Sequence, residues 1–205
     1  MNKESKRKEN EIMTTIFFVR HAEPDLSIHD DYSRPLTPKG ASDCSLIIDF
    51  LHDKKIDVVL SSPFKRAIDT VLPFANSVNL PVEQVEDFRE RRVDSGWIDD
   101  FNAFAKKQWE DFTYKLIDGE CLLEVQERNI KALKQILGQH SGKNIVIGTH
   151  GTALSTIINY YDNTYGYENF QSIVGIFPWV VKMEFDGKTC LEIEQMDLMV
   201  KHDME

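Results

Sequence analysis

The sequence has no long apolar run and few cysteines. No stretch approaches the roughly 20 apolar residues that a membrane-spanning helix needs, and the first residues lack the apolar centre of a signal peptide. The three cysteines, Cys44, Cys121 and Cys190, are odd in number and far apart, which argues against a disulfide framework and against a C-x-x-C metal or redox pair. We therefore expect a protein of the reducing cytoplasm without a membrane partner.

Positive charge is also scarce. The chain has 24 Lys and Arg against 34 Asp and Glu, which gives a formal net charge of −10. Proteins that bind nucleic acid without sequence preference rely on Lys and Arg to neutralise phosphates, so nucleic acid is not an expected partner. A small anionic ligand would need a local cationic pocket, and any cluster of Arg and His is therefore informative.

The length and composition predict one folded domain. The chain has 205 residues, of which 41% are apolar and 28% are charged, as is typical of globular proteins. Residues 1–12 are polar and charge-dense without an apolar period, which is typical of a mobile tail. Met13 directly precedes the first strand pattern, so an alternative start of the protein at this residue stays open. We expect a single domain over residues 13–205.

Strand and helix patterns alternate along most of the chain. Short β-branched and apolar runs predict buried strands at residues 14–19, 56–60, 81–85 and 144–147. Apolar residues at helical spacing predict helices at 38–51, 63–75, 101–138 in two pieces, and 153–158. The final third predicts strands at 173–177, 180–185 and 191–193, with a hairpin turn at Asp186-Gly187. The charged segment 86–100 has no period, and we interpret it as a functional loop.

This alternation predicts an α/β fold, a three-layer α/β/α sandwich around a mainly parallel central sheet. Ligand sites in such sheets gather beyond the carboxyl ends of the strands. Three polar clusters follow predicted strands: Arg20-His21, the segment 61–66, and Thr149-His150-Gly151. Two Arg and two His at one place would form an anion pocket, because guanidinium groups bind phosphate oxygens in pairs. Helices that begin near Pro63 and Gly151 would add backbone N–H donors.

The residues at these strand ends also match known motifs. Arg20-His21-Ala22-Glu23 resembles the Arg-His-Gly-Glu signature of the histidine phosphatase superfamily, the clan that includes cofactor-dependent phosphoglycerate mutase. The resemblance extends over about residues 15–155, and its other motifs occur in the family's order. They are Leu36-Thr37 with Gly40, Ser61-Ser62 with Arg66-Ala67 and Thr70, Gly119-Glu120 with Arg128, and Thr149-His150-Gly151.

The resemblance implies a role for each matching residue. His21 would be the nucleophile that takes the phosphoryl group, in a pocket that solvent can reach. Arg20, Arg66 and His150 would hold the phosphoryl oxygens. Glu90 would be the general acid and then the general base, with Glu86 and Asp94 as lesser candidates. The arrangement requires no metal and no other cofactor, and the fold expected from the resemblance is that of phosphoglycerate mutase.

Two departures from the mutase pattern bear on the reaction. Ser27 stands where mutase-like members carry an Asn that contacts phosphate, and its hydroxyl is still able to donate a hydrogen bond. After Glu90, the chain fits the phosphatase-type Glu followed by Gly-x-Trp, through Gly96-Trp97, better than the mutase pattern. We therefore expect a phosphatase that acts on a small phosphorylated metabolite.

The sequence leaves three questions open: the reaction, the residues that would bind a second anionic group, and the oligomeric state. A phosphoglycerate mutase-type isomerase is one alternative, and a catalytically silent protein that only binds a phospho-ligand is another. The loop after Glu90 offers further cations for a second anionic group of the ligand, namely Arg91, Arg92, Lys106 and Lys107. The oligomeric state is undetermined, with a homodimer among the options.

Overall fold

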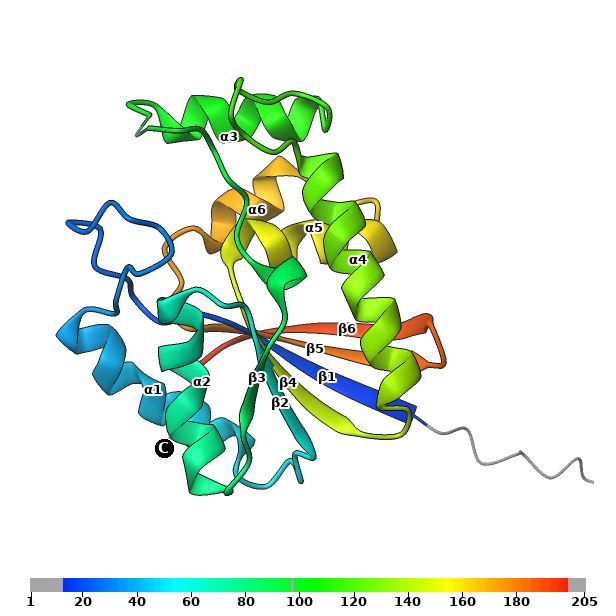
Figure 1. Cartoon of the computed structure of the whole chain (residues 1–205). Coiled ribbons are helices and arrows are strands. Elements are labelled where there is room, and N and C mark those ends of the chain that lie inside the picture. The colour runs from blue at the N-terminus through cyan, green and yellow to red at the C-terminus, as the bar shows by residue number, and fades with distance from the viewer. Residues whose placement is uncertain (1–12, 97, 199–205) are drawn as a thin grey trace, which may run out of the picture.

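The structure is a computed structural model that describes residues 13–96 and 98–198. A six-stranded sheet with the order β3-β2-β4-β1-β5-β6 forms its centre (Figure 1). The strands are β1 (Met13–Arg20), β2 (Val58–Ser61), β3 (Val82–Gln84), β4 (Asn144–Thr149), β5 (Trp179–Asp186) and β6 (Thr189–Asp197). The first four strands along the order pair in parallel, and β5 and β6 add an antiparallel edge. The predicted mainly parallel α/β sheet is therefore confirmed.

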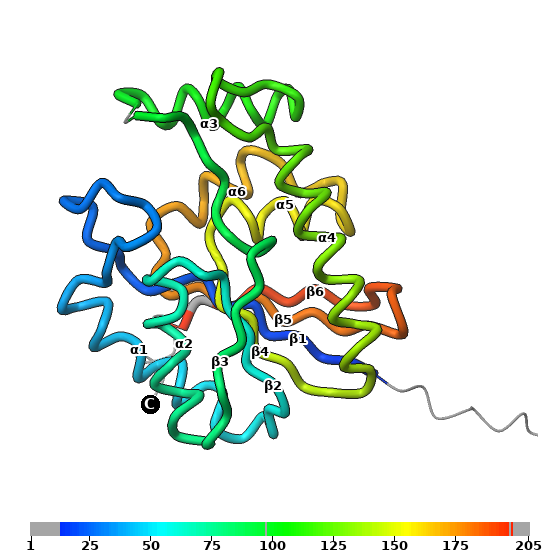
Figure 2. The backbone as a smooth tube through the Cα atoms, viewed as in Figure 1, coloured from blue at the N-terminus to red at the C-terminus, as the bar shows by residue number. Residues whose placement is uncertain are grey.

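Helices cover both faces of this sheet. They are α1 (Pro38–Leu51), α2 (Lys65–Ser77), α3 (Phe101–Glu110), α4 (Leu122–Gln139), α5 (Gly151–Tyr161) and α6 (Tyr167–Ile173), with a short 3₁₀ helix η1 (Glu86–Phe88) after β3. Helices α1 and α2 lie on one side of the sheet, and α4, α5 and α6 lie on the other, as the ribbon and the tube both show (Figures 1 and 2). Helix α3 lies beyond α6, at the far end from α1.

The central strands are buried on both faces. Ile16 and Phe18 of β1 pack into the cluster on the α4 and α5 side, and Phe17 and Val19 pack into the cluster on the α1 and α2 side. This follows from the alternation of side chains along a strand, and it explains why the run 16–19 is apolar throughout instead of alternating with polar residues.

Thr37 begins α1 as its sequence predicts. Its side chain accepts a hydrogen bond from the Gly40 N–H, and Pro38 occupies the first helical position. Gly40 is required here because a Cβ on it would lie 2.3 Å from the Glu23 carbonyl oxygen. The Leu-Thr-x-x-Gly motif thus joins the start of α1 to the segment that leaves β1.

One predicted element is wrong. The apolar run 173–177 is not a strand: α6 ends at Ile173, and the following residues form an irregular segment that leads into β5. Its backbone carbonyls are used differently, because those of Ile173, Val174 and Ile176 accept hydrogen bonds from the Arg20 side chain. The hairpin at Asp186-Gly187 is confirmed by the antiparallel pairing of β5 with β6.

Within the described residues, no helix is long and apolar enough to cross a membrane. The mobile tail predicted for residues 1–12 lies outside the described residues, so this prediction and that of one domain over 13–205 stay predictions.

Candidate active site

The strand ends bring Arg20-His21 and His150 together. Strands β1 and β4 are parallel neighbours, with Arg20 opposite Thr149, and the His21 N–H donates to the Thr149 carbonyl at 3.1 Å. The two imidazole ring centroids are 5.3 Å apart. Ser62, which follows β2, completes the row, because its N–H donates to the Gly148 carbonyl and its hydroxyl lies 2.7 Å from His150 Nε2.

The surroundings of His21 fix its tautomer and its charge. Nδ1 lies 2.8 Å from the Ala22 carbonyl oxygen, which can only accept, so Nδ1 carries the hydrogen and Nε2 keeps its lone pair. Burial, and then the positive charges of Arg66 and Arg20, hold the pKa of His21 well below its usual 6.5. The imidazole is therefore neutral at physiological pH, and Nε2 is a nucleophilic nitrogen.

The Arg66 side chain extends toward His21 from the first turn of α2. Its side chain is 3% exposed, and burial lowers its pKa, although it remains a cation at neutral pH. Four residues further along α2, the Thr70 hydroxyl accepts a hydrogen bond from the Ala22 N–H at 2.9 Å. The Arg-Ala-x-x-Thr motif thus fixes the backbone beside His21 as well as the guanidinium in front of it.

Arg20 packs against the first residue of α5. Burial lowers the pKa of Arg20 to about 10, so it too stays charged at neutral pH. A Cβ on Gly151 would lie 3.2 Å from its guanidinium carbon, so the glycine makes room for the arginine. His150 is the residue before α5, and its pKa is lowered well below 6.5 by burial and then by Arg66. Two cations and two neutral imidazoles therefore surround one point.

The Glu90 carboxylate lies at the start of α5, the helix that begins at Gly151. Its carboxylate accepts hydrogen bonds from the Thr152 N–H at 3.0 Å and from the Ala153 N–H at 3.2 Å. This is the position at which the dipole of a helix favours an anion. Burial lowers the pKa of Arg20 and Arg66, and the charge of Glu90 opposes this shift at both, which means that the carboxylate lies within electrostatic reach of the two cations.

Glu120 and Arg128 stabilise the backbone segment 87–90, which carries Glu90. Arg128 donates hydrogen bonds to the backbone carbonyls of Asp87, Arg89 and Glu90. Glu120 in turn pairs with Arg128 at 2.9 Å and with Arg89 at 2.9 Å. The Gly-Glu motif with its later Arg is therefore a brace for the backbone that carries Glu90, a function that motif matching alone did not reveal.

Phe177 covers His21, which the sequence did not predict. Its ring stacks on the His21 ring at a centroid distance of 5.6 Å, and the Arg20 guanidinium carbon lies 3.9 Å from the same ring centroid. His21 is only 6% exposed, whereas the sequence predicts a pocket that solvent reaches. The prediction failed because the run 173–177 was interpreted as a strand, which gave its residues no place at the site.

Asp31 is a second residue that the sequence did not reveal. Its carboxylate lies 3.1 Å from Arg66 Nη2 and 2.8 Å from Arg34 Nη1, and its backbone carbonyl accepts from Arg66 Nη1. Arg34, which is buried, also lowers the pKa of His21 through its charge. Both residues come from the loop before α1, where polar residues without a period gave no signal beyond the density of charge.

Two of the sequence candidates lie elsewhere. The Ser27 side chain is exposed, and its hydroxyl donates to the Asp25 carboxylate at 2.6 Å. Glu86 is also exposed and lies 3.8 Å from Arg89 Nε. The structure brings Arg20, His21, Arg66, Glu90, His150 and Gly151 together, whereas these two residues have other contacts.

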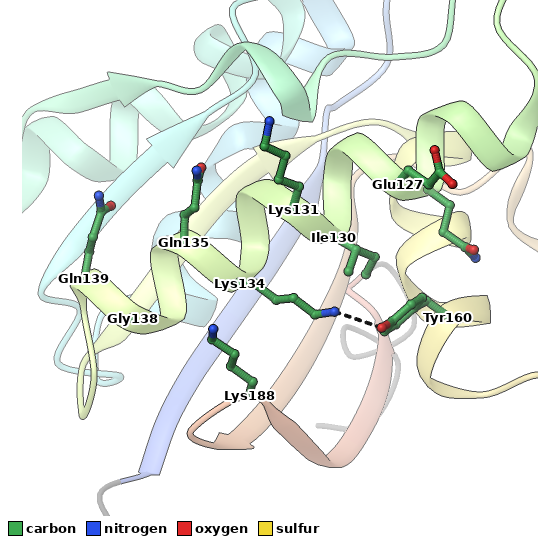
Figure 3. A pocket seen from close by; sticks show the side chains of 10 residues that line it. Glu127, Ile130, Lys131, Lys134, Gln135, Gly138, Gln139, Tyr160 and Lys188 are labelled. Atoms are coloured by element: carbon green, nitrogen blue, oxygen red, sulfur yellow. Dashed lines mark hydrogen bonds between the residues drawn. The ribbon is translucent and has the colours of Figure 1, made fainter.

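A separate groove of about 740 Å³ runs along the outer side of α4. Figure 3 shows Lys134 directed at the Tyr160 hydroxyl with Lys188 nearby, whereas Lys131 extends from α4 in another direction. Lys188 belongs to the turn between β5 and β6, two residues after Asp186, which pairs with Met13 at the start of β1. The Lys188 end of the groove thus lies at the opposite end of the sheet from His21. Among the described residues, no group of three or more His, Cys, Asp or Glu could hold a metal ion.

Comparison with known proteins places these motifs in one family. The model of the histidine phosphatase superfamily (branch 1) matches residues 16–190. The chain is 26% identical to an uncharacterized phosphatase, PhoE, of Bacillus subtilis (strain 168), over 71% of the chain and 76% of the relative. It is 30% identical to a metal-independent phosphoserine phosphatase of Arabidopsis thaliana, over 75% of the chain and 71% of the relative.

The fold is also similar to that of solved phosphatase structures. A solved structure of a phosphoserine phosphatase mutant from Entamoeba histolytica in complex with phosphoserine is similar with a TM-score of 0.74 and 18% identity. The match covers 90% of this chain and 98% of that one. At this identity the likeness concerns the fold, whereas the sequence relatives and the family model concern ancestry.

Proposed function

The chain belongs to the histidine phosphatase superfamily (branch 1), and from this premise we propose that it hydrolyses a small phosphomonoester through a phosphohistidine on His21. Its relatives include proteins named as phosphatases, which supports a hydrolase. The residues that would act are His21 as nucleophile, Glu90 as acid and base, and Arg20, Arg66, His150 and Gly151 as phosphate ligands.

The observation that carries the proposal is the state of the His21 ring. A histidine attacks phosphorus only through an unprotonated nitrogen, and here Nδ1–H donates to the Ala22 carbonyl while the low pKa keeps Nε2 free. The same hydrogen bond would stabilise the ring after the attack, because a phosphoryl group on Nε2 leaves the imidazole positively charged. No change of tautomer is needed between the two half-reactions.

The first half-reaction makes one bond and breaks one. His21 Nε2 attacks the phosphorus atom, the bond from phosphorus to the ester oxygen breaks, and that oxygen takes a proton from the Glu90 carboxyl to leave as an alcohol. Arg20 and Arg66 balance the charge of the phosphoryl oxygens during the transfer. The N-terminus of α5 at Gly151 adds the field of the helix dipole at the same point.

The second half-reaction returns the enzyme to its first state. Water attacks the phosphorus of the phosphohistidine, Glu90 takes a proton from this water, and the bond from phosphorus to Nε2 breaks. Inorganic phosphate leaves, and Nε2 recovers its lone pair. Glu90 is then protonated and ready for the next ester, so the proton balance closes over one turnover.

An isomerase of the mutase type would transfer the phosphoryl group back to the bound intermediate before water reaches it. Two observations favour water as the acceptor: the curated relatives named above are phosphatases, and the sequence after Glu90 departs from the mutase pattern. A catalytically silent binder has no need of a neutral nucleophilic histidine together with a carboxylate at the same pocket.

The test combines a rapid quench with two assays. After milliseconds with a radiolabelled phosphomonoester, we expect acid-labile and alkali-stable label on wild-type protein, and none on His21→Asn. Phosphate release from a panel of phosphomonoesters should exceed mutase turnover with and without bisphosphoglycerate. Mutase turnover above hydrolysis would replace this proposal with the isomerase, and neither label nor turnover across the panel would leave a binding protein.

A further inference from the structure

Buried polar atoms that have no partner gather at the active site. Seven buried side-chain nitrogen and oxygen atoms lack a hydrogen-bonding partner among the described residues, and four of them belong to Arg20, Arg91 and His150. Folded proteins pair nearly all such atoms, so a cluster of exceptions indicates groups that are kept for a ligand. Arg20 Nε and His150 Nδ1 belong to the phosphate site already described. Arg91 contributes the other two atoms, Nε and Nη2.

Arg91 is the residue after the proposed acid, and its side chain is 2% exposed. Its Nη1 donates to the Thr152 hydroxyl in the first turn of α5, beside Gly151. Burial lowers the pKa of Arg91, and the carboxylates of Glu90 and then Asp31 oppose this shift through their charges. Asp31 is also the group that contacts Arg66. The Arg91 guanidinium therefore lies beside Gly151, one of the proposed phosphate ligands.

The two unpartnered atoms form one edge of the guanidinium. Nε and Nη2 point their hydrogens in parallel, and this edge matches the two oxygens of a carboxylate. The rings of Phe101 and Phe104 of α3 lie against the group, with centroids 5.1 Å and 5.6 Å from its central carbon. These rings occupy part of the space around the guanidinium, and a carboxylate would bind the Nε and Nη2 edge in the plane of the group.

We propose that Arg91 is a specificity-determining residue that binds a carboxylate of the substrate through its Nε and Nη2 edge. The substrate class is then a phosphomonoester with a carboxylate a few bonds from the phosphate, such as a phosphorylated hydroxy acid or amino acid. This inference rests on the proposed function for its setting, since it assigns the second anionic group to the same pocket.

A purely structural role would leave a different pattern of contacts. An arginine that only joins the Glu90 segment to α5 would use its donors on protein acceptors, as Arg128 does with three backbone carbonyls and Glu120. Arg91 uses one nitrogen in this way and leaves a complete edge unpaired. The neighbouring Arg92 side chain is exposed, so the two residues differ in burial although they carry the same charge.

The test compares substrates that differ in the carboxylate. O-phosphoserine and O-phosphoethanolamine differ only by this group, and 3-phosphoglycerate and glycerol 3-phosphate differ by a carboxylate against a hydroxymethyl group. For wild type we expect kcat/KM to be about 10- to 100-fold higher for the acid of each pair, the range of a charge-assisted hydrogen-bonded contact. A ratio near one in both pairs would overturn the inference.

Variants of Arg91 and Arg92 test whether Arg91 causes the preference for substrates with a carboxylate. In Arg91→Gln we expect the ratio of the two kcat/KM values to fall to near one. The fall should come from a lower kcat/KM for phosphoserine, while kcat/KM for phosphoethanolamine changes by less than about three-fold. Arg91→Lys keeps the buried charge but loses the parallel edge, so about a 10-fold loss for the acid is expected. Arg92→Gln removes the same charge at an exposed position and should keep the wild-type ratio. Equal loss for both substrates in Arg91→Gln would show a structural role and refute the inference.

Binding separates this inference from the reaction. In His21→Ala protein, calorimetry should give a dissociation constant for phosphoserine about 10- to 100-fold below that for phosphoethanolamine, and Arg91→Gln should abolish the difference. If this preference appears without turnover in the wild type, the proposed hydrolysis fails and the carboxylate site stands. If hydrolysis occurs without any preference in binding or in kcat/KM, the hydrolysis stands and the carboxylate site fails.

Discussion

The active site has two sides that differ in how the chain builds them. The rear wall consists of Arg20, His21, Arg66, Glu90 and His150, which lie at or near the ends of strands and helices. The front cover consists of Asp31 and Phe177, which lie in irregular segments before α1 and after α6. Backbone pairing between β1, β4 and β2 fixes most of the rear wall, whereas side-chain contacts with the rear wall fix the front cover.

Because of this difference, we expect the two sides to contribute differently to catalysis and to the binding of phosphate. The rear wall holds the groups that we propose to react and to bind phosphate in one geometry, as electrostatic stabilisation of a transition state requires. The front cover contacts the same groups with a carboxylate and a ring, and both must give way or adjust when a phosphoryl group reaches Arg66 and His21. Chemistry should therefore depend on the rear wall, and the affinity for phosphate on the front cover.

The largest effect is expected at His21. In His21→Ala we expect kcat to fall by at least about 10⁴-fold, because the proposed mechanism loses the group that would form the covalent intermediate. The melting temperature should change little, since the backbone contact of His21 with Thr149 is kept. His52→Ala, at the exposed end of α1, is the matched control. Residual turnover within 10-fold of wild type would move the reaction to another nucleophile.

Glu90→Gln is expected to have the next largest effect. A general acid contributes about 10² to 10⁴-fold, and the loss should be greatest for alkyl phosphates, whose leaving oxygen needs the proton most. Nitrophenyl phosphate should lose much less in kcat. Glu86→Gln, a lesser candidate in the sequence that proves exposed, is the control and should retain activity. Equal losses for both leaving groups would count against Glu90 as the acid.

The sequence was informative about the rear wall for a physical reason. Arg20, His21 and His150 follow apolar runs that can only be buried parallel strands, and the carboxyl ends of such strands must meet at one edge. The front cover offered no such constraint. Phe177 stands in an apolar run whose carbonyls bind Arg20 instead of a neighbouring strand, and Asp31 contacts a residue 35 positions away. Contacts of this kind depend on the finished fold.

The buried histidines of the rear wall should make the fold sensitive to acid. The pKa of both His21 and His150 is far below 6.5 in the fold, so the unfolded chain binds more protons as the pH falls below about 6.5. Stability is then present above that pH and is lost below it, by up to about 1.4 kcal/mol per pH unit for each histidine.

Urea unfolding between pH 7.5 and pH 5.5 measures this dependence. His21→Asn should lose about half of the excess slope of the wild type, because one of the two buried histidines is removed. His52→Asn changes a histidine that is exposed at the end of α1 and should keep the wild-type slope. A wild-type stability that does not fall with acid would mean that these rings can be protonated in the fold at little cost.

A smaller effect is expected from Asp31→Asn. The carboxylate competes with phosphate for Arg66, so its removal should lower the inhibition constant of inorganic phosphate. Asp31 is 43% exposed, and such a pair contributes about 1 kcal/mol or less, which corresponds to at most about a five-fold change. Asp30→Asn is the control, because Asp30 bonds Ser33 instead of an arginine of the site. Weaker inhibition by phosphate would show that Asp31 supports the site instead of competing for it.

The smallest effect is expected at Ser27, and it tests where the front cover ends. The family resemblance gives this residue a phosphate contact, but its hydroxyl donates to Asp25 at 2.6 Å and its side chain is exposed. Ser27→Ala should therefore change kcat/KM and the inhibition constant of phosphate by less than two-fold, whereas Asp31→Asn in the same loop changes the latter. A loss of 10-fold or more in Ser27→Ala would mean that the loop before α1 rearranges when phosphate binds and that Ser27 then reaches the phosphoryl oxygens, which would make the loop part of the phosphate site.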